Sequence, residues 1–234
     1  MYLKTVTILQ NNTIRMAQVH FFAFSPFSEN TYVIYDETKE CIIIDPGCYT
    51  EVERKTLSTF IQEQGLTPVR LINTHCHLDH VFGNRYVAET YKLALEIHEG
   101  ELPVLESVPV VAQMYGIPNV QQSPDPDPDK FINEGDTITF GNTALSVFFT
   151  PGHSPASVSF YCKKDNFIIG GDVLFQSSIG RTDLPGGDLN TLMKSIFDHF
   201  LTLPDETTVY SGHGNPTTVG AERTGNPFIL EHAR

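Results

Sequence analysis

Side chains that bind metal ions gather in one short stretch of the sequence, at His75, His77, Asp79 and His80. They follow the apolar run 69–72, which predicts a short buried strand. Chain leaving a strand can turn His75 and His77 toward one point, while Asp79 and His80, at the start of a helix, face a second point. Such a crowded set would be costly to desolvate without a cation, and its mixed nitrogen and oxygen donors fit zinc, iron or manganese better than calcium.

The pattern of these residues, HxHxDH, resembles the signature of the metallo-β-lactamase superfamily. Three further candidates occur in the order that the resemblance requires, namely His153, Asp172 and His213. Each follows an apolar, strand-like run. The resemblance covers about residues 70–215 and implies a mixed α/β fold, the four-layer αβ/βα sandwich. Periodicity alone predicts only a mixture of helices and strands.

The resemblance also implies a role for each candidate. It implies two divalent metal ions, with zinc as the first choice and iron or manganese as alternatives. Their shared water would lose a proton readily, because bound cations lower its pKa from about 15.7 to about 7. Asp79 would also orient the hydroxide as a general base. The implied ligands are His75, His77 and His153 for one metal, Asp79, His80 and His213 for the other, and Asp172 bridging both.

The segment 180–188, just after Asp172, resembles a loop of small bacterial glyoxalase-II-like proteins. This resemblance implies hydrolysis of a small-molecule thioester, an acylated glutathione or a similar thiol. Arg181 is the candidate to meet a substrate carboxylate, although an ion pair with Asp183 or Asp188 is at least as strongly indicated. The sequence stops soon after His213, with no room for the helical region that holds glutathione in longer glyoxalases, so another thiol carrier is an alternative.

Two other functions remain open. A mononuclear iron persulfide dioxygenase shares the fold and the Gly-Arg-Thr-Asp loop at 180–183, and such relatives can retain the second ligand set. A non-catalytic, metal-stabilised binding protein is the other alternative. A β-lactamase is disfavoured by the lack of an export signal.

The surrounding sequence predicts the elements that must position these residues. Strands are expected at 19–22, 30–35, 41–44 and 93–97, and again at 137–140, 145–149, 158–161 and 167–169. Helices are expected at 51–64, 82–91, 102–115 and 189–200, the third broken or bent around Pro109. Two strand-rich halves, each trailed by helices, indicate sheets packed face to face with helices outside.

Several single residues near the candidate ligands have predicted roles. Cys76 should face the core, because neighbouring side chains of an extended segment point opposite ways. Asp45 either supports a ligand histidine or caps a turn. Ser154 is expected to be a hydrogen-bond partner within its loop. His98 is expected to be structural or to line the cleft, and His20 to be an ordinary strand residue.

Composition limits the classes of partner. The net charge is −13, from 28 acidic against 15 basic residues. With no Lys/Arg cluster, it disfavours nucleic acid. No apolar run approaches a membrane span, and the 4 cysteines form no CxxC pair, which indicates reduced thiols in the cytoplasm. We expect one domain over 1–234, with 1–15 as a loose extension and 123–129 as an exposed acidic loop or a gate. The sequence leaves the oligomeric state open.

Overall fold

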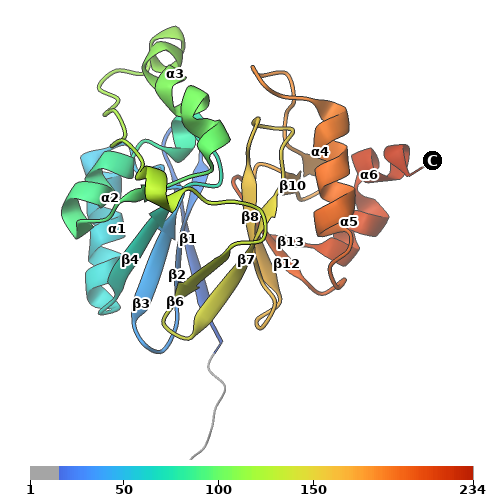
Figure 1. The fold of residues 1–234 in the computed structure, drawn as a ribbon, viewed down its shortest axis with the longest axis horizontal. Helices are drawn as coiled ribbons and strands as arrows, with labels where there is room; N and C mark the ends of the chain where they lie inside the picture. Colours follow the sequence, from blue (N-terminus) through green and yellow to red (C-terminus); the bar gives the residue numbers. More distant parts are fainter. Residues whose placement is uncertain (1–15, 234) are drawn as a thin grey trace, which may run out of the picture.

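Two β-sheets pack face to face, with helices on their outer sides, in a computed structural model that describes residues 16–233 (Figure 1). The helices α1 (Glu51–Glu63) and α2 (Asn84–Tyr91) flank one sheet, and α4 (Leu189–Ser195) flanks the other. This is the predicted αβ/βα sandwich. The extension predicted at 1–15 lies outside the described residues.

The first sheet has 5 strands in the order β1-β2-β3-β4-β5. The first three strands are antiparallel, whereas β3, β4 and β5 run parallel. Parallel neighbours need a crossover, which α1 and α2 supply here. The strands are β1 (Gln18–Phe24), β2 (Glu29–Tyr35), β3 (Glu40–Ile44), β4 (Thr67–Ile72) and β5 (Leu95–Glu96).

The second sheet has 6 strands in the order β13-β12-β9-β8-β7-β6, and a separate hairpin pairs β10 with β11. β12 lies parallel to β9, and the other neighbours are antiparallel. The predicted strands of this half are all present. The strands are β6 (Thr137–Phe140), β7 (Thr143–Phe149), β8 (Val158–Cys162), β9 (Phe167–Gly171), β10 (Leu174–Phe175), β11 (Ser178–Ile179), β12 (Thr208–Ser211) and β13 (Thr217–Thr218).

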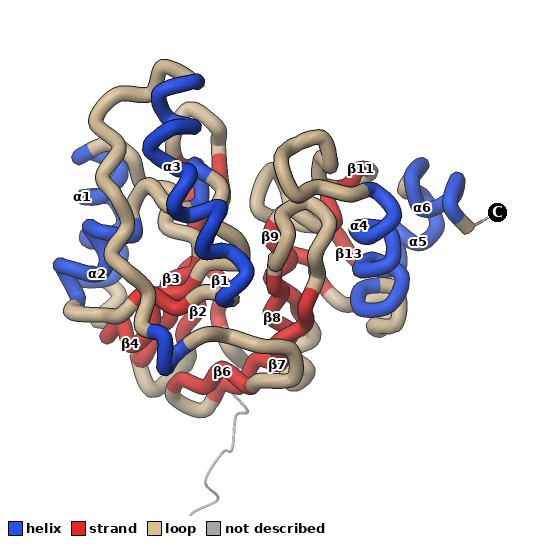
Figure 2. Tube along the Cα trace, turned by 45° about the horizontal axis from the view of Figure 1, so that its top comes forward, coloured by secondary structure: helices blue, strands red, loops and turns tan. Residues whose placement is uncertain are grey.

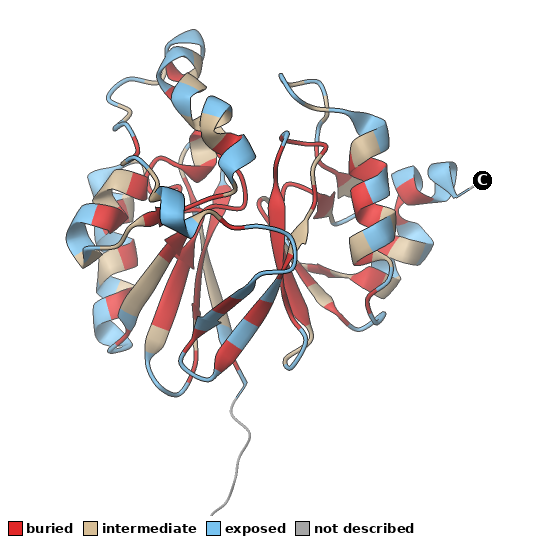
Figure 3. Cartoon of the chain, in the orientation of Figure 1, coloured by how far each residue is buried: buried red, intermediate tan, exposed pale blue. Residues whose placement is uncertain are grey.

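Buried residues are concentrated on the strands of the two sheets and on the helix faces toward them (Figure 3). The three consecutive isoleucines of β3 show both layers. Ile42 and Ile44 pack between the sheets, against residues such as Phe160 of β8. Ile43 points the other way and packs with Leu57 of α1. The prediction that this strand is buried on both faces is confirmed.

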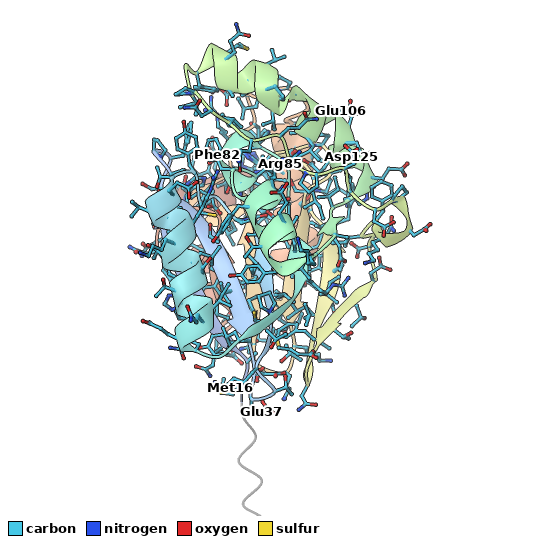
Figure 4. The ribbon with its side chains drawn as sticks, turned by 90° about the vertical axis from the view of Figure 1, so that its left-hand side faces the viewer. Met16, Glu37, Phe82, Arg85, Glu106 and Asp125 are labelled. Atoms are coloured by element: carbon cyan, nitrogen blue, oxygen red, sulfur yellow. The ribbon has the colours of Figure 1, made fainter. Side chains whose placement is uncertain are left out.

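The hydrogen bonds of Asp36 connect the two halves of the chain at the end of the sandwich opposite the candidate ligands. Asp36 lies in the turn between β2 and β3, and its carboxylate accepts from the backbone N–H of Asn142 at 2.7 Å and from the hydroxyl of Thr143 at 2.9 Å. In the same turn, Glu37 lies at the end of the molecule near Met16 (Figure 4). The carboxylate of Asp36 therefore ties the β2–β3 turn to the β6–β7 turn.

The start of α2 differs from the prediction. A helix was predicted to begin at 82 and to carry Asp79 and His80 at its mouth. Instead a separate 3₁₀ turn, Leu78–His80, holds both residues, and α2 begins only at Asn84 after Gly83. The prediction of the helix was right and its boundary was wrong, because the tight turn has too few residues to show in the pattern of apolar residues.

Helix α1 confirms the prediction for 51–64. Thr50 and Glu53 form a capping box at its start, and Leu57 and Ile61 are buried. Val52, which the periodicity placed on the apolar face, is instead 75% exposed.

Helix α3 (Leu102–Met114) continues through Pro109, so the break predicted there does not occur. It stands above the ends of the sheet strands, across from the β11 region (Figure 2). The proline is exposed. On this outer face of the helix its ring meets water rather than packed side chains.

The chain that follows α3 crosses the molecule without strands as far as β6. Its Pro/Asp-rich part, 123–129, is coil apart from a 3₁₀ turn at Pro128–Lys130, as the alternating prolines predict. Asp125 lies in this part, near Arg85 of α2 (Figure 4). The Nε–H of Arg85 donates to the backbone oxygen of Gln122 at 2.7 Å, which holds the preceding residues against α2.

The end of the chain contains helices that the sequence did not predict. The helix expected at 189–200 forms as α4 followed by a π-helical segment, Ile196–Phe200. Two short helices follow, α5 (Val219–Gly225), capped by Thr218, and α6 (Pro227–His232), capped by Asn226. Among residues 16–233, no helix combines the length and apolar character needed to cross a membrane.

Candidate metal centre

The histidines and aspartates selected from the sequence lie together at one edge of the sandwich, where strands of both sheets end. The chain leaving β4 carries His75, and the loop between β7 and β8 carries His153. Asp172 and His213 follow β9 and β12. These last two strands are parallel neighbours, so their carboxyl ends bring both residues to the same edge.

His75, His77 and His153 form one group, in which a ring nitrogen from each residue lies within 4.8 Å of the others. Nδ1 of His77 is 2.8 Å from Nε2 of His153. The ring of His75 is nearly perpendicular to both, with interplanar angles of 90° and 84°. The fold brings His153 to the two histidines of the motif from 76 residues farther along the chain.

Asp79, His80 and His213 form a second group under the same 4.8 Å limit. Nε2 of His213 is 3.1 Å from Oδ2 of Asp79, and Nε2 of His80 is 3.9 Å from the same oxygen. His80 is fully buried, and the other two side chains are partly open to solvent.

Asp172 lies between the two groups. Its Oδ2 is 3.4 Å from Nε2 of His153, in the first group, and 3.6 Å from Nε2 of His213, in the second. Its Oδ1 is 3.5 Å from Nε2 of His80. A Cβ atom on Gly212 would lie 2.1 Å from that Oδ1, so a glycine is needed for the carboxylate to lie here.

Unpaired polar atoms lie between the two groups. Whether a metal ion would satisfy them tests how well these residues fit metal ions. Within the described part of the chain, Nε2 of His75, Nε2 of His80 and Oδ1 of Asp172 are buried and have no hydrogen-bond partner. Leaving buried polar atoms unpaired costs about 1–3 kcal/mol each. Divalent cations would satisfy these lone pairs, and imidazole with carboxylate is a donor set that zinc and iron accept. The residues fit two such ions.

Hydrogen bonds on the far side of the rings leave the inward nitrogens free to bind a cation. Nδ1 of His80 is 3.1 Å from Oδ2 of Asp45, and Nδ1 of His153 is 2.7 Å from the backbone oxygen of Arg181. Each Nδ1 donates to an oxygen, so Nε2 is the nitrogen of each ring that faces the site of a cation. Asp45 also accepts from the backbone and the hydroxyl of Thr74. Of its two predicted roles, the structure favours support of a ligand histidine.

The electrostatics of the centre separate neutral from charged side chains. Burial, reinforced by neighbouring histidines, lowers the pKa of His75 well below its ordinary value and that of His77 to about 3. Burial alone would raise the pKa of Asp172, but His80 and the other histidines hold it well below its ordinary value. At neutral pH His75 and His77 therefore offer imidazole lone pairs beside the ionised carboxylate of Asp172.

Glu101 is a buried residue that the sequence analysis missed. Its carboxylate accepts from the backbone N–H of Cys76 at 2.9 Å, from the hydroxyl of Ser154 at 2.7 Å and from the backbone N–H of Ala156 at 2.8 Å. It thus joins the loop of His75 and His77 to the loop of His153. The side chain of Cys76 points into the core and Ser154 serves as a hydrogen-bond partner, as predicted.

Glu29 is a second missed carboxyl group near the centre. It is fully buried, and Oε1 lies 3.9 Å from Nδ1 of His80. Burial, the largest influence, raises its pKa well above the ordinary value despite the neighbouring His80. Only its position beside Asn30 at the start of a predicted strand marked it in the sequence, and that gave no sign of burial.

His20 and His98 lie outside both groups. The ring of His20 stacks on Phe60 with centroids 4.0 Å apart. Nδ1 of His98 accepts from the backbone N–H of Gly100 at 3.0 Å, and its ring packs near Phe149. Both are structural residues here.

A cleft of about 890 Å³ opens over the two groups. It reaches His77, Asp79, Asp172 and His213 at its floor, and Arg181 lies on its lining. The side chain of Arg181 is 55% exposed and makes two hydrogen bonds of 2.7 Å to the carboxylate of Asp183. The predicted ion pair with Asp183 is therefore formed.

The sequence profile described as the metallo-beta-lactamase superfamily matches residues 25–213. The chain is similar to "Probable metallo-hydrolase YqgX" of Bacillus subtilis, at 39% identity over 87% of this chain and 93% of that protein. It is 35% identical to hydroxyacylglutathione hydrolase GloC of Haemophilus influenzae, over 90% of this chain and 97% of GloC. It is 32% identical to the mitochondrial persulfide dioxygenase ETHE1 of Homo sapiens, over 85% of this chain and 70% of ETHE1.

Solved structures show the same fold. The B3 metallo-beta-lactamase BLEG-1 superposes with a TM-score of 0.82 at 37% identity, covering 91% of this chain and 99% of BLEG-1. The protein TTHA1623, solved in a di-iron-bound form, superposes with a TM-score of 0.80 at 35% identity, covering 90% of this chain and all of TTHA1623 (100%). Both likenesses extend over the whole sandwich.

Proposed function

The chain belongs to the metallo-β-lactamase superfamily, and on this basis we propose that it is a metal-dependent hydrolase that cleaves thioesters of the S-acylglutathione type. The observation that carries the proposal is the position of Asp172 between two complete ligand groups at the floor of an open cleft. A structural site would be closed on all sides, whereas a catalytic site keeps access for substrate. The similarity to GloC supports the thioester as substrate.

In this proposal His75, His77 and His153 would hold one divalent cation, Asp79, His80 and His213 would hold another, and Asp172 would be available to either. We propose zinc, with iron or manganese as alternatives, and iron gains support from the di-iron form of TTHA1623. Cations bound there would supply a hydroxide nucleophile at neutral pH and polarise the thioester carbonyl.

The protein's own residues have separate tasks in this reaction. Asp79 lies at the floor of the cleft, 3.1 Å from His213, where its carboxylate can orient the attacking water and accept its proton. Asp45 and the backbone oxygen of Arg181 keep His80 and His153 in one tautomer and one orientation. The side chain of Arg181 is the group of the cleft that can meet a negatively charged part of the substrate.

The cytoplasm is the compartment that we propose. All 4 cysteines are buried free thiols, which suits a reducing environment.

A second candidate function is persulfide oxidation at a mononuclear iron, which the similarity to ETHE1 favours. The two candidates differ in what they consume and in metal content. The test is to load the purified protein with zinc or with iron and to measure bound metal, release of free thiol from a panel of acyl thioesters, and oxygen uptake with a persulfide. Two ions per chain with thiol release supports the hydrolase. One iron with oxygen uptake and no thiol release contradicts it.

A further inference from the structure

The cleft over the metal centre has apolar walls on two sides. One wall is formed by α3, through residues that include Val104, Val111 and Tyr115. The facing wall comes from the hairpin β10–β11 and the loop after it, through residues that include Phe175, Ile179 and Leu184. These two parts of the chain stand opposite each other in Figure 2. A linear apolar group would lose its contact with water on both sides here.

The same cleft is poor in positive charge. Among the described residues that line it, Arg181 is the sole lysine or arginine. Its guanidinium is already paired with Asp183, and the pair lowers the pKa of the Asp183 carboxyl group to about 2. A carrier such as glutathione, with two carboxylates, would thus find one exposed and already paired cation. The apolar walls must serve a different part of the substrate.

We propose that the cleft selects thioesters by the length of an apolar acyl chain, which lies between α3 and the segment 175–185. The polar thiol carrier extends toward solvent past Arg181. This inference rests on the proposed hydrolase function and specifies its substrate class. In the reaction, water adds across the carbon–sulfur bond, giving a carboxylic acid from the acyl chain and a free thiol from the carrier.

The size of the effect follows from the burial of methylene groups. Each methylene moved from water into an apolar site gains about 0.8 kcal/mol, which corresponds to roughly a fourfold gain in kcat/KM. We therefore expect kcat/KM to rise about fourfold per methylene until the chain fills the cleft. A site built for a short polar acyl group would show no such rise.

The test compares acetyl, butanoyl, hexanoyl and octanoyl thioesters of one carrier with the metal-loaded protein. Neighbouring valines on α3 provide a matched pair of variants, because Val111 lines the cleft and Val110 is 60% exposed. In Val111→Phe the aromatic ring would fill part of the cleft that the acyl chain of the substrate should occupy. The octanoyl-to-acetyl ratio of kcat/KM should fall at least tenfold in Val111→Phe and stay unchanged in Val110→Phe.

A binding measurement gives a readout apart from turnover. Ketone analogues, in which a methylene replaces the thioester sulfur, cannot be cleaved, and calorimetry with the metal-loaded protein measures their Kd. The Kd should fall with chain length. If Val111→Phe fails to fold, Val104→Thr, which keeps the shape of valine, should weaken binding of the octanoyl analogue several-fold more than that of the acetyl analogue.

The outcomes separate this inference from the function on which it rests. Thioester cleavage that does not depend on chain length, or an equal loss of the ratio in Val110→Phe, overturns the inference and leaves the hydrolase standing. Failure to cleave any thioester overturns the proposed function and this inference with it.

Discussion

The carboxylate of Glu101 accepts a hydrogen bond of 2.7 Å from the hydroxyl of Ser154, the residue next to His153, while it also binds the backbone of Cys76, between His75 and His77. One buried side chain at the start of α3 thus fixes the spacing of two loops. The cleft wall and the candidate metal centre share this anchor.

Replacing Glu101 by Gln should loosen the first ligand group. In the wild type, three donors share the two carboxylate oxygens of Glu101. The amide of Gln has the same size but offers them one acceptor oxygen. Loss of such support typically weakens metal binding by about 10- to 100-fold. Competition with a chelator measures this affinity, and Glu99→Gln, an exposed change in the same 3₁₀ turn, is the control. Equal affinities in the two variants would contradict the role given to Glu101.

Replacing Asp45 by Asn should affect the second ligand group. Asp45 has a φ of 49°, a conformation that Asn tolerates, so the backbone should be preserved. The carboxylate oxygen that accepts from the Nδ1–H of His80 is negatively charged in the wild type, and the Asn side chain lacks that charge. We expect binding of the second metal ion to weaken about 10- to 100-fold and that of the first to change less. Stepwise metal titration shows the difference, and uniform weakening of both ions would count against the assignment.

Asp172→Ala removes the carboxylate that lies between the two groups. Each group should lose a donor, so the protein should retain less than its full metal content and release thiol from thioesters at least 100-fold more slowly. Metal analysis and a thiol assay on the same preparation test both. As a control, Asp198→Ala alters an exposed aspartate of the second half. Full metal content in Asp172→Ala would show that this residue is dispensable for binding.

Arg181→Ala should change substrate recognition and leave stability unaltered. The Arg181–Asp183 pair is exposed, and exposed pairs contribute little to stability. The backbone oxygen that holds His153 remains in the variant. KM should rise for a thioester with a carboxylate on its carrier and stay constant for a neutral carrier, with kcat preserved. Lys194→Ala, an exposed cation on α4, controls for net charge. An equal rise for both carriers would rule out contact with the carboxylate.

Asp36→Ala should destabilise the protein by about 2 kcal/mol, because the buried hydroxyl of Thr143 and the partly buried N–H of Asn142 lose their acceptor. Burial alone would raise the pKa of Asp36, but hydrogen bonds from Thr38, Asn142 and Thr143 hold it below the ordinary value of 3.8. This stabilisation is thus complete above pH 3.8 and is lost as the pH falls through the folded-state pKa.

Urea unfolding at several pH values tests this stabilising role, with Glu206→Ala, an exposed carboxylate in another turn, as the control. The difference between wild type and Asp36→Ala should shrink in acid. A difference that grows as the pH falls has the wrong sign for this mechanism.

Much of the candidate metal centre could be predicted from the sequence, because four of its residues lie close together in the chain. His75, His77, Asp79 and His80 fall in one stretch, and long apolar runs such as 41–44 marked the strands that position them. The superfamily resemblance added the more distant residues.

What the sequence could not predict depends on tertiary contacts or on very short elements. The partners of Glu101 lie 25, 53 and 55 residues away, so no spacing indicates its role. Strands of 2 residues, such as Leu174–Phe175, are too short for alternation to appear. For Pro109 the sequence left a break or a bend open, and the continuous helix from Leu102 to Met114 excludes only the break.

Because the candidate ligands are divided between the two halves of the chain, each ligand group is complete only when the two halves have packed together. The segment after β4 supplies His75, His77, Asp79 and His80, and the second sheet supplies His153, Asp172 and His213. Neither half holds all members of either proposed ligand group. Binding of a cation by either ligand group would therefore stabilise the association of the two halves of the chain.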